Sequence, residues 1–356
     1  MDIELQLPWH KEQWRRIVQQ LSTKSLPHAF LFEGHAGVGK SHFVKQFSRL
    51  VLCEKSALGR DSSTNKLAEH DHLQACGICK QCKLFDSDSH PDFKTISPEE
   101  SASKIKVDQV RQLVDFFGQS SLQGGRKISV ISPAEALNLN SANALLKTLE
   151  EPSADSVLIL VSHQPGLLLP TIKSRCQVVH FNSPSVAESI SWLQQQTGEM
   201  SLDKTLSEAD LSEVLALAQF APLKAFDYLQ NDALEEHRTM LDELAAFLKN
   251  EFVSSTLATR WNDDNAVLRL AWMMAWVETI LKMKLSHDLA NEAPAQKMFM
   301  YLSEKSSNAE LFDLYDTCLQ QFKLFQGSSN PNKVLSFELL LHKWSGLMRK
   351  TKPDGR

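Results

Sequence analysis

The segment Gly34–Ser41, which reads GHAGVGKS, constrains the fold of this 356-residue chain more than any other feature. It matches the phosphate-binding (P-loop) pattern G-x-x-x-x-G-K-S/T in full, follows the apolar run HAFLFE and precedes a helical pattern. Glycines allow a tight loop whose N–H groups point at phosphate oxygens, and the N-terminus of the next helix adds favourable partial charge. The residues expected to bind nucleotide are Gly34, Gly37, Gly39, Lys40 and Ser41. Lys40 would reach the β- and γ-phosphates and the Ser41 hydroxyl would ligate Mg²⁺; a chance turn and a loop that no longer binds are the alternatives.

The acidic pair that a nucleotide-hydrolysing P-loop protein needs is missing from the segment RKISVISPAEAL. Hydrolysis requires an Asp that holds the Mg²⁺ shell and a neighbouring carboxylate that orients the attacking water, and Ser132 and Pro133 can do neither. Glu135 lies past a proline turn, so we do not expect it to replace the missing base. Losing general-base help alone costs roughly 10²–10⁴-fold in rate. We therefore expect the loop to bind ATP or ADP with Mg²⁺ without turning it over.

The first half of the chain alternates short apolar runs with helical patterns. Runs rich in Val, Ile and Phe predict strands at 28–33, 92–97, 127–132, 156–163 and 177–181. Helical patterns lie between them, at Lys40–Leu52, Val107–Gln119 and Ser141–Leu149. Strands separated by helices imply a mostly parallel, doubly wound sheet, and this α/β domain is expected to span residues 1–182.

The rest of the chain is expected to be all-α, because no convincing strand pattern follows NSPSVAES at 182–189. Residues 183–231 predict a small helical module with turns near Thr197-Gly198 and Ala221-Pro222. Residues 232–356 predict a longer helical block. Its most apolar run, LAWMMAWV, is too short to span a bilayer and indicates a buried helix.

Composition and charge limit the kinds of protein that this chain can be. Hydrophobic residues make up 42% and charged residues 23%, which are ordinary globular values, and 356 residues are too many for one core. The start, MDIELQLPWHKEQWRR, lacks the apolar region of a signal peptide, so we expect a cytoplasmic protein with no membrane attachment. A net charge of −5 without a long basic block argues against strong autonomous binding to nucleic acid.

Three of the six cysteines fall within CGICKQC, and a fourth stands upstream. The candidate metal ligands are Cys53, Cys76, Cys79 and Cys82. Four thiolates suffice for a closed tetrahedral Zn²⁺ site, whose role would be structural. An iron–sulfur cluster and free thiols are the alternatives, although the x₃-C-P that follows C-x₂-C-x₂-C in bacterial ferredoxins is absent. His70 or His72 could compete with Cys53 as the fourth ligand.

The segment Ser174-Arg175-Cys176 lies between two predicted core strands. An isolated Arg is usually a solvated or salt-bridged side chain. These residues alone therefore predict no function for Arg175.

The order of these motifs resembles the clamp-loader branch of the AAA+ ATPases. That order is P-loop, cysteine cluster, HPDF, KVDQVRQL, NSANALLKTLEEPS and SRC, and the parts specific to the branch are ANALLKTLEEP (142–152) and SRC (174–176). Within the branch, the lost acidic pair is similar to the delta-prime subunits of bacterial DNA polymerase III rather than to the ATP-hydrolysing tau/gamma subunits. LPWHKEQW and HPDF support the same choice.

The resemblance implies a RecA-like AAA+ domain with an inserted zinc module at about 53–82, then a small helical lid and a C-terminal helical collar. The collar would join five subunits, with tau/gamma and delta subunits as partners. Their ring opens the sliding clamp and loads it on primed DNA as part of the DNA polymerase holoenzyme. The resemblance also implies a stator without ATPase activity of its own, whose Arg175 enters the ATP site of the adjacent tau/gamma subunit.

The chain departs from the delta-prime pattern because several of those subunits have lost the P-loop, which is intact here. At the lid position where hydrolysing relatives have a phosphate-sensing Arg, this chain has Leu223, with Lys224 adjacent. An ATP-hydrolysing clamp-loader-type protein and a zinc-containing nucleic-acid-binding protein are the alternatives to a non-hydrolysing subunit.

Overall fold

The computed structural model describes residues 7–55, 74–99, 103–123, 125–153, 155–199, 206–285, 294–327 and 331–348. The chain divides into two compact units, Met1–Asp227 and Tyr228–Arg356. The first unit contains both the α/β part and the helices that follow it. The division into three domains at 182 and 231 stays a prediction. None of the helices that the structure describes is long and apolar enough to cross a membrane.

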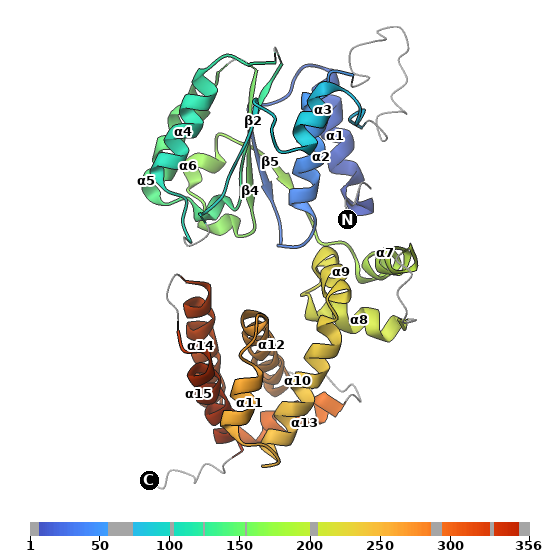
Figure 1. The fold of residues 1–356 in the computed structure, drawn as a ribbon, viewed down its shortest axis with the longest axis vertical. Coiled ribbons are helices and arrows are strands. Elements are labelled where there is room, and N and C mark those ends of the chain that lie inside the picture. The colour runs from blue at the N-terminus through green and yellow to red at the C-terminus, as the bar shows by residue number, and fades with distance from the viewer. Residues whose placement is uncertain are drawn as a thin grey trace. The chain divides into compact units, whose positions relative to one another are not determined.

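Five parallel strands form the sheet of the first unit, in the order β2-β3-β4-β1-β5 (Figure 1). The strands are β1 (Ala29–Glu33), β2 (Phe93–Ile96), β3 (Lys127–Ile131), β4 (Ser156–Ser162) and β5 (Gln177–His180). All five predicted strands are confirmed to within one or two residues. Every residue of β3 and β4 is buried, as expected of strands covered on both faces.

The strand register places the carboxyl ends of β1, β3 and β4 at one edge of the sheet. Glu33, the last residue of β1, lies opposite Ser162, the last residue of β4. Ile131, the last residue of β3, lies opposite Leu160 of β4. Ligands of open parallel sheets bind outside the carboxyl ends of the strands, so this edge is where a site is expected.

Helices cover both faces of the sheet (Figure 1). On one face lie α1 (Lys11–Ser22), α2 (Lys40–Leu52) and α3 (Lys80–Asp86), whose apolar side chains share a core with the strands. On the other lie α4 (Val107–Gly118), α5 (Leu139–Glu150) and α6 (Pro170–Lys173). The three helices predicted in this region are confirmed, and α2 has the bounds that the sequence indicated. Short 3-10 helices occur at Pro8–His10, Ala134–Ala136 and Pro165–Leu167.

Three further helices follow: α7 (Val186–Glu199), α8 (Glu208–Leu217) and α9 (Pro222–Gln230), and the first unit ends within α9, at Asp227. Helix α7 ends at Glu199, one residue after the expected turn near Thr197-Gly198, and α8 begins at Glu208. Thr197 stays helical, with its hydroxyl donating to the carbonyl of Leu193 at 2.9 Å, and a glycine is tolerated near a helix end. The turn near Ala221-Pro222 is confirmed, since Pro222 begins α9 as proline often begins helices.

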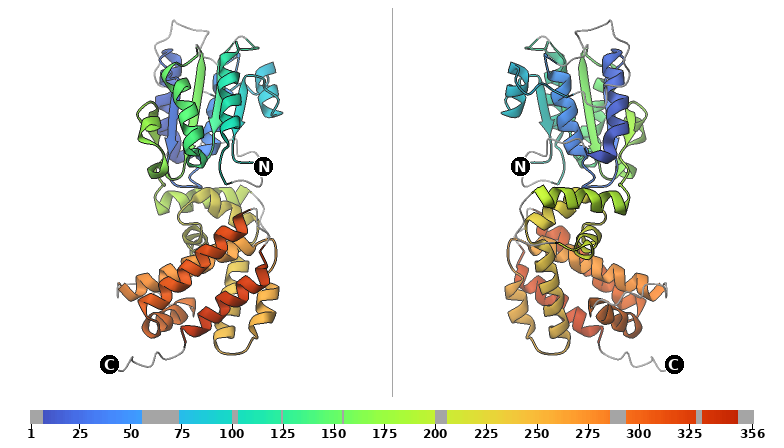
Figure 2. Two further views of the ribbon diagram at one scale, coloured as in Figure 1. Left: turned by 90° about the vertical axis from the view of Figure 1, so that its left-hand side faces the viewer. Right: turned by 90° about the vertical axis from the view of Figure 1, so that its right-hand side faces the viewer.

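Helices alone make up the described part of the second unit (Figure 2). They are α10 (Ala233–Leu248), α11 (Ser254–Arg260), α12 (Ala266–Leu285), α13 (Pro294–Lys305), α14 (Asn308–Gln326) and α15 (Lys333–Gly346). The helix α12 carries LAWMMAWV and packs against α13 and α14, so this run is the buried helix that the sequence predicted. Two of the buried indoles in this core are hydrogen-bonded: Trp276 Nε1 donates to His237 Nε2 at 2.9 Å, and Trp261 Nε1 donates to Glu243 at 2.7 Å. Nε1 of Trp272 and of Trp344 is buried without a partner.

Candidate nucleotide site and metal site

The P-loop connects β1 to α2 at the carboxyl edge of the sheet. At Gly34 the loop has no room for a Cβ atom, and its backbone has a positive φ that residues with side chains rarely adopt. Gly34 has φ +154°, and a Cβ there would lie 2.2 Å from the carbonyl oxygen of Phe181, which follows β5. The loop therefore passes so close to the neighbouring chain segment that only glycine fits.

Lys40 folds back over this loop. Its Nζ donates to the carbonyls of Gly34 and His35, each at 2.6 Å, and the residue is 2% exposed. Burial lowers the pKa of Lys40 to about 8, while the charge of nearby Glu135 acts in the opposite direction. The ammonium therefore remains mostly charged at neutral pH, at the place where the motif requires a cation for phosphate.

Two residues of α9 contact the P-loop. The N–H of Leu223 donates to the carbonyl of Gly37 at 3.3 Å, and a Cβ on Gly37 would lie 2.7 Å from Cβ of Ala221. Lys224 lies against the same glycine, and burial lowers its pKa. The sequence placed Leu223 at the phosphate-sensing position; the structure brings the adjacent cation, Lys224, to the loop as well.

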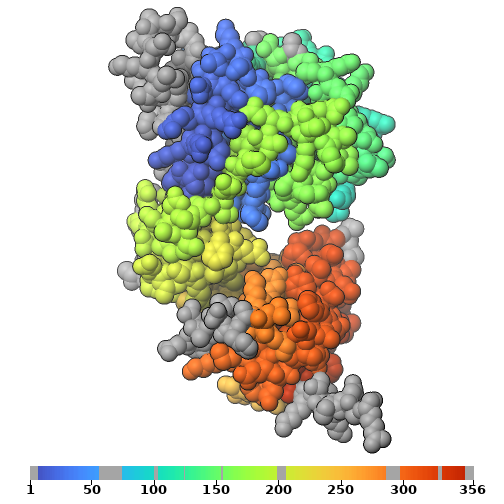
Figure 3. Space-filling model, turned by 180° about the vertical axis from the view of Figure 1, so that it is seen from behind, coloured from blue at the N-terminus to red at the C-terminus, as the bar shows by residue number. Residues whose placement is uncertain are grey.

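The segment before α1 contacts the loop from another side. Figure 3 shows the blue N-terminal residues packed against the green residues of the same unit. Trp9 Nε1 donates to the carbonyl of Val38 at 2.9 Å. The ring of His10 is buried in edge contact with Phe43 and Phe181. Burial lowers the pKa of His10 to about 3, so the imidazole is neutral at physiological pH. Trp9 and His10 of LPWHKEQW therefore pack against the P-loop and the residues around it.

The end of β3 carries no carboxylate. Ser132 and Pro133 follow the strand, joined by a cis peptide bond, and the 3-10 helix Ala134–Ala136 comes next. A cavity of about 360 Å³ opens beside Ser41 and Ser132. Its other lining residues are Val44, Lys45, Phe85, Asp88, Phe93, Thr95, Val130 and Val161. The structure thus brings the predicted Mg²⁺ ligand Ser41 and the Ser132 of the degenerate pair to one largely apolar hollow.

Glu135 and His163 meet at the same edge, which sequence reasoning missed. The backbone N–H of His163, directly after β4, donates to Glu135 Oε1 at 3.0 Å. Burial lowers the pKa of His163, and the charge of Lys40 lowers it further. The signal that could have found His163 is its place after a core strand, since the carboxyl ends of parallel strands share one edge.

The four candidate cysteines come together at the far end of α2. All four Sγ atoms, those of Cys53, Cys76, Cys79 and Cys82, lie within 4.8 Å of one another. Backbone N–H groups donate to three of these sulfurs at 3.3–3.4 Å. N–H···S hydrogen bonds of this kind orient and stabilise metal-bound thiolates. The cluster could hold a metal with four sulfur ligands; His70 and His72 lie outside the described residues.

Arg175 lies in the connection between α6 and β5. Its guanidinium forms an ion pair with Glu150 at the end of α5, at 2.7 Å, and donates to the carbonyl of Thr171 at 3.0 Å. The arginine side chain is 36% exposed. The SRC segment and the end of LLKTLEEP, which lie apart in the sequence, therefore form one surface feature.

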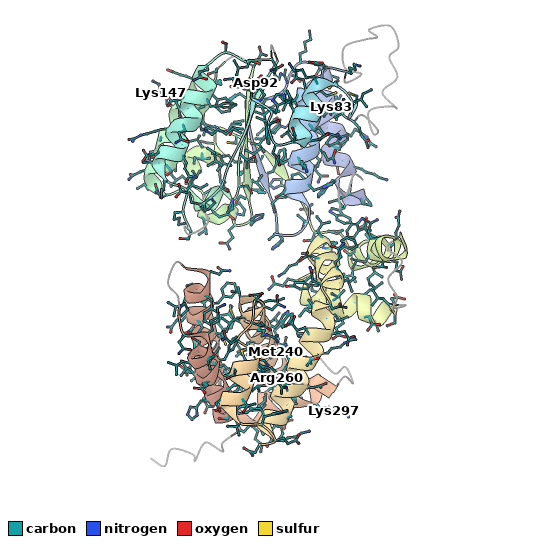
Figure 4. All side chains as sticks on the ribbon, viewed as in Figure 1. Lys83, Asp92, Lys147, Met240, Arg260 and Lys297 are labelled. Carbon is teal, nitrogen blue, oxygen red and sulfur yellow. The ribbon has the colours of Figure 1, made fainter. Side chains whose placement is uncertain are left out.

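The HPDF segment has a structural role. Asp92, at the start of β2, is buried and accepts hydrogen bonds from Ser121 Oγ and from the N–H groups of Leu122 and Gln123, at 2.8–2.9 Å (Figure 4). Burial opposes its ionisation, but these donors lower the pKa of Asp92 below its ordinary value. The carboxylate holds the loop after α4 beside the cysteine module.

Known proteins match the chain in both units. Residues 9–185 match the family described as DNA polymerase III, delta subunit, and residues 231–346 match the family described as DNA polymerase III, delta subunit, C terminal. The DNA polymerase III subunit delta′ of Pseudomonas aeruginosa is 37% identical over 96% of this chain and 97% of its own length. That of Escherichia coli is 28% identical over 77% of this chain and 76% of its own. A solved gamma subunit-related protein from Thermotoga maritima is 20% identical, covers 96% of this chain with all of its own, and has a TM-score of 0.45.

Proposed function

Because the chain belongs to the DNA polymerase III subunit delta′ family, we propose that it works as a non-hydrolysing stator subunit of the clamp loader. The observation that carries the proposal is the 37% identity to a delta′ subunit over nearly the whole of both chains. The end of β3 agrees with it, because Ser132 and Pro133 stand where hydrolysis needs an Asp and a water-orienting carboxylate.

The P-loop of this subunit binds ATP or ADP with Mg²⁺ and does not turn it over. Lys40 and Lys224 supply positive charge at the loop, and Ser41 would ligate the metal. The loop geometry supports binding because its glycines have the conformations that turn N–H groups toward a ligand. Mg²⁺ supplies charge neutralisation for the phosphates when it is bound.

The cysteine cluster holds one structural Zn²⁺. Four sulfur atoms within 4.8 Å of one another match the ligands of a tetrahedral site with no open position, which stabilises a fold and offers no place for substrate. The site joins α2 to the segment that leads into α3, so its metal would fix the module against the α/β domain.

Arg175 acts in trans, in the ATP site of the neighbouring tau/gamma subunit. It is exposed, and its planar guanidinium can exchange a carboxylate for a phosphate, since both are bidentate acceptors. In this arrangement the chain contributes to catalysis without an active site of its own. It would do so from a cytoplasmic ring.

Reconstitution tests the proposed function. Mixed with tau/gamma-type and delta subunits, the chain should join a five-subunit ring through its C-terminal helices and support loading of the sliding clamp on primed DNA. Its failure to enter any complex with those subunits would contradict the proposal. Steady-state phosphate release by the isolated chain at ordinary ATPase rates would instead favour the alternative of an active ATPase.

A further inference from the structure

Three polar side-chain atoms at the P-loop edge of the sheet are buried without a hydrogen-bond partner. They are Glu135 Oε2, Ser162 Oγ and His163 Nδ1. Ser162 is completely buried and ends β4 opposite Glu33, the residue that leads into the P-loop. Leaving a buried polar group unsatisfied costs about 1–3 kcal/mol. Orphaned atoms grouped at one strand edge therefore indicate a polar ligand rather than a packing fault.

The carboxylate of Glu135 is held in place by only one of its oxygens. Oε1 accepts from the His163 N–H, and Oε2 is buried without a hydrogen-bond partner. Lys40 does not use it, because its ammonium donates to the carbonyls of Gly34 and His35. The two charges are nevertheless close enough for Glu135 to raise the pKa of Lys40 against the effect of burial.

Charge decides which ligand suits such an oxygen. A carboxylate beside nucleotide phosphates is repelled unless a cation lies between them. Mg²⁺ keeps several of its water molecules when it binds phosphates, and those waters are strong hydrogen-bond donors. A hydrated Mg²⁺ therefore satisfies the free oxygen of Glu135 and offsets its charge, whereas a phosphate alone does neither.

We propose that Glu135, oriented by His163, is the acidic residue of this P-loop site and accepts a hydrogen bond from the water shell of the nucleotide's Mg²⁺. This inference rests on the proposed binding of Mg²⁺-nucleotide. Glu135 is then a positioning residue that replaces, from a different place in the sequence, the Asp missing at the end of β3. One carboxylate oxygen is already engaged by His163, so the same group is not free to orient an attacking water.

Nucleotide affinity with and without Mg²⁺ tests the proposal on the full-length chain. Titrations with ATP should show that Mg²⁺ strengthens binding to the wild type. Glu135→Gln should lose roughly 10–100-fold of the Mg²⁺-dependent affinity, the range seen when a residue outside the metal's direct ligands is removed. Binding in EDTA should stay within about twofold of the wild type, because no ligand to phosphate has been removed.

Glu135→Gln is expected to fold like the wild type, and this can be checked. Glutamine retains an oxygen that can accept from the His163 N–H, and a circular dichroism melt checks that the variant is folded. Glu135→Asp, which keeps the charge but shortens the side chain, should lose part of the Mg²⁺ effect. The matched control is Glu99→Gln, which also removes one negative charge but acts on a surface pair with Lys106.

An equal Mg²⁺ effect in Glu135→Gln and the wild type would overturn the inference. So would tighter binding of Mg²⁺-ATP by Glu135→Gln, which would show that the carboxylate only repels phosphate. A wild-type chain that joins clamp-loader subunits but gains no affinity from Mg²⁺ would overturn this inference and leave the proposed function standing. A chain that binds Mg²⁺-ATP through Glu135 but never assembles with clamp-loader subunits would support this inference and contradict the proposed function.

Discussion

The guanidinium of Arg175 lies 2.7 Å from the carboxylate of Glu150. The two residues come from the connection after α6 and from the end of α5, and both side chains are substantially exposed. An exposed pair of this kind contributes at most about 1 kcal/mol to stability. The pair holds the guanidinium in one position at the surface; under the proposed function, a neighbouring subunit's phosphate would replace Glu150 as its partner.

Replacing Arg175 with alanine should separate catalysis from assembly. Folding, metal content and ring formation should persist, while DNA- and clamp-stimulated ATP hydrolysis and clamp loading by the ring decrease. An arginine finger is worth roughly 10³–10⁵ in rate at the one site it completes, so the total rate should fall by that site's share. Arg175→Lys should not rescue it, since lysine lacks the planar fork.

Arg111→Ala is the matched control, because it removes another exposed arginine paired with an acidic residue, Asp108. Wild-type hydrolysis and loading with Arg175→Ala would defeat the assignment. Failure of that variant to assemble would make Arg175 an interface residue.

Nucleotide binding should depend on Lys40 while phosphate release stays at background. Lys40→Ala removes the cation that bonds the loop carbonyls at 2.6 Å, so equilibrium dialysis with ATP should show no binding. Lys147→Ala, an exposed lysine of α5, should bind like the wild type. Turnover by the isolated wild-type chain that Lys40→Ala removes would show a competent ATPase instead.

The cysteine cluster predicts about one Zn²⁺ per chain after purification without added zinc. Cys76→Ser should lower the metal content and the melting temperature together, because a structural metal contributes directly to folding. Cys176→Ser, at a cysteine outside the cluster, should retain the zinc. Less than about half a Zn²⁺ per wild-type chain, with intact folding and assembly, would count against a zinc site.

His10 predicts a loss of stability in mild acid. Its pKa is lowered from 6.5 in the unfolded chain to about 3 in the folded one. The unfolded state therefore binds more protons between these values, and stability falls as pH drops below about 6.5. From pH 8 to pH 5 the loss from this one group is about 2 kcal/mol.

Urea unfolding at the two pH values measures this effect. His10→Phe, which keeps an aromatic ring beside Phe43 and Phe181, should flatten the dependence on pH relative to the wild type. His342→Gln, at an exposed histidine, should leave the slope unchanged. A slope unaffected by His10→Phe would show that other groups cause the acid sensitivity.

Helix bounds could be predicted from the sequence where neighbouring residues alone determine them. Helix α2 begins at Lys40 and ends at Leu52 as expected, because the glycine turn precedes it and its apolar spacing is regular. The exact helix end was less predictable, because α7 keeps Thr197 and Gly198 in its last turn and ends at Glu199, one residue after the expected turn.

Contacts between distant segments were beyond sequence reasoning. The proline after Ser132 suggested that Glu135 turns away from the site, but its carboxylate meets the His163 N–H, 28 residues later. The pairing of Glu150 with Arg175 was equally unpredictable, because it depends on how α5 and α6 pack. The pattern of apolar residues predicts each strand separately. Only the arrangement of the strands in the sheet shows which strand ends lie at the same edge.

Helix α2 joins the two candidate ligand sites of the first unit. It starts at Lys40 in the P-loop and ends at Leu52, with Cys53 as its C-terminal cap. Thirteen residues at 1.5 Å each form a rod of about 20 Å. If the cysteine cluster loses its metal, the C-terminal end of α2 is no longer held in place and its last turn is free to fray. Chelation should therefore weaken ATP affinity from that distance, and by thermodynamic reciprocity bound nucleotide should slow the release of the metal.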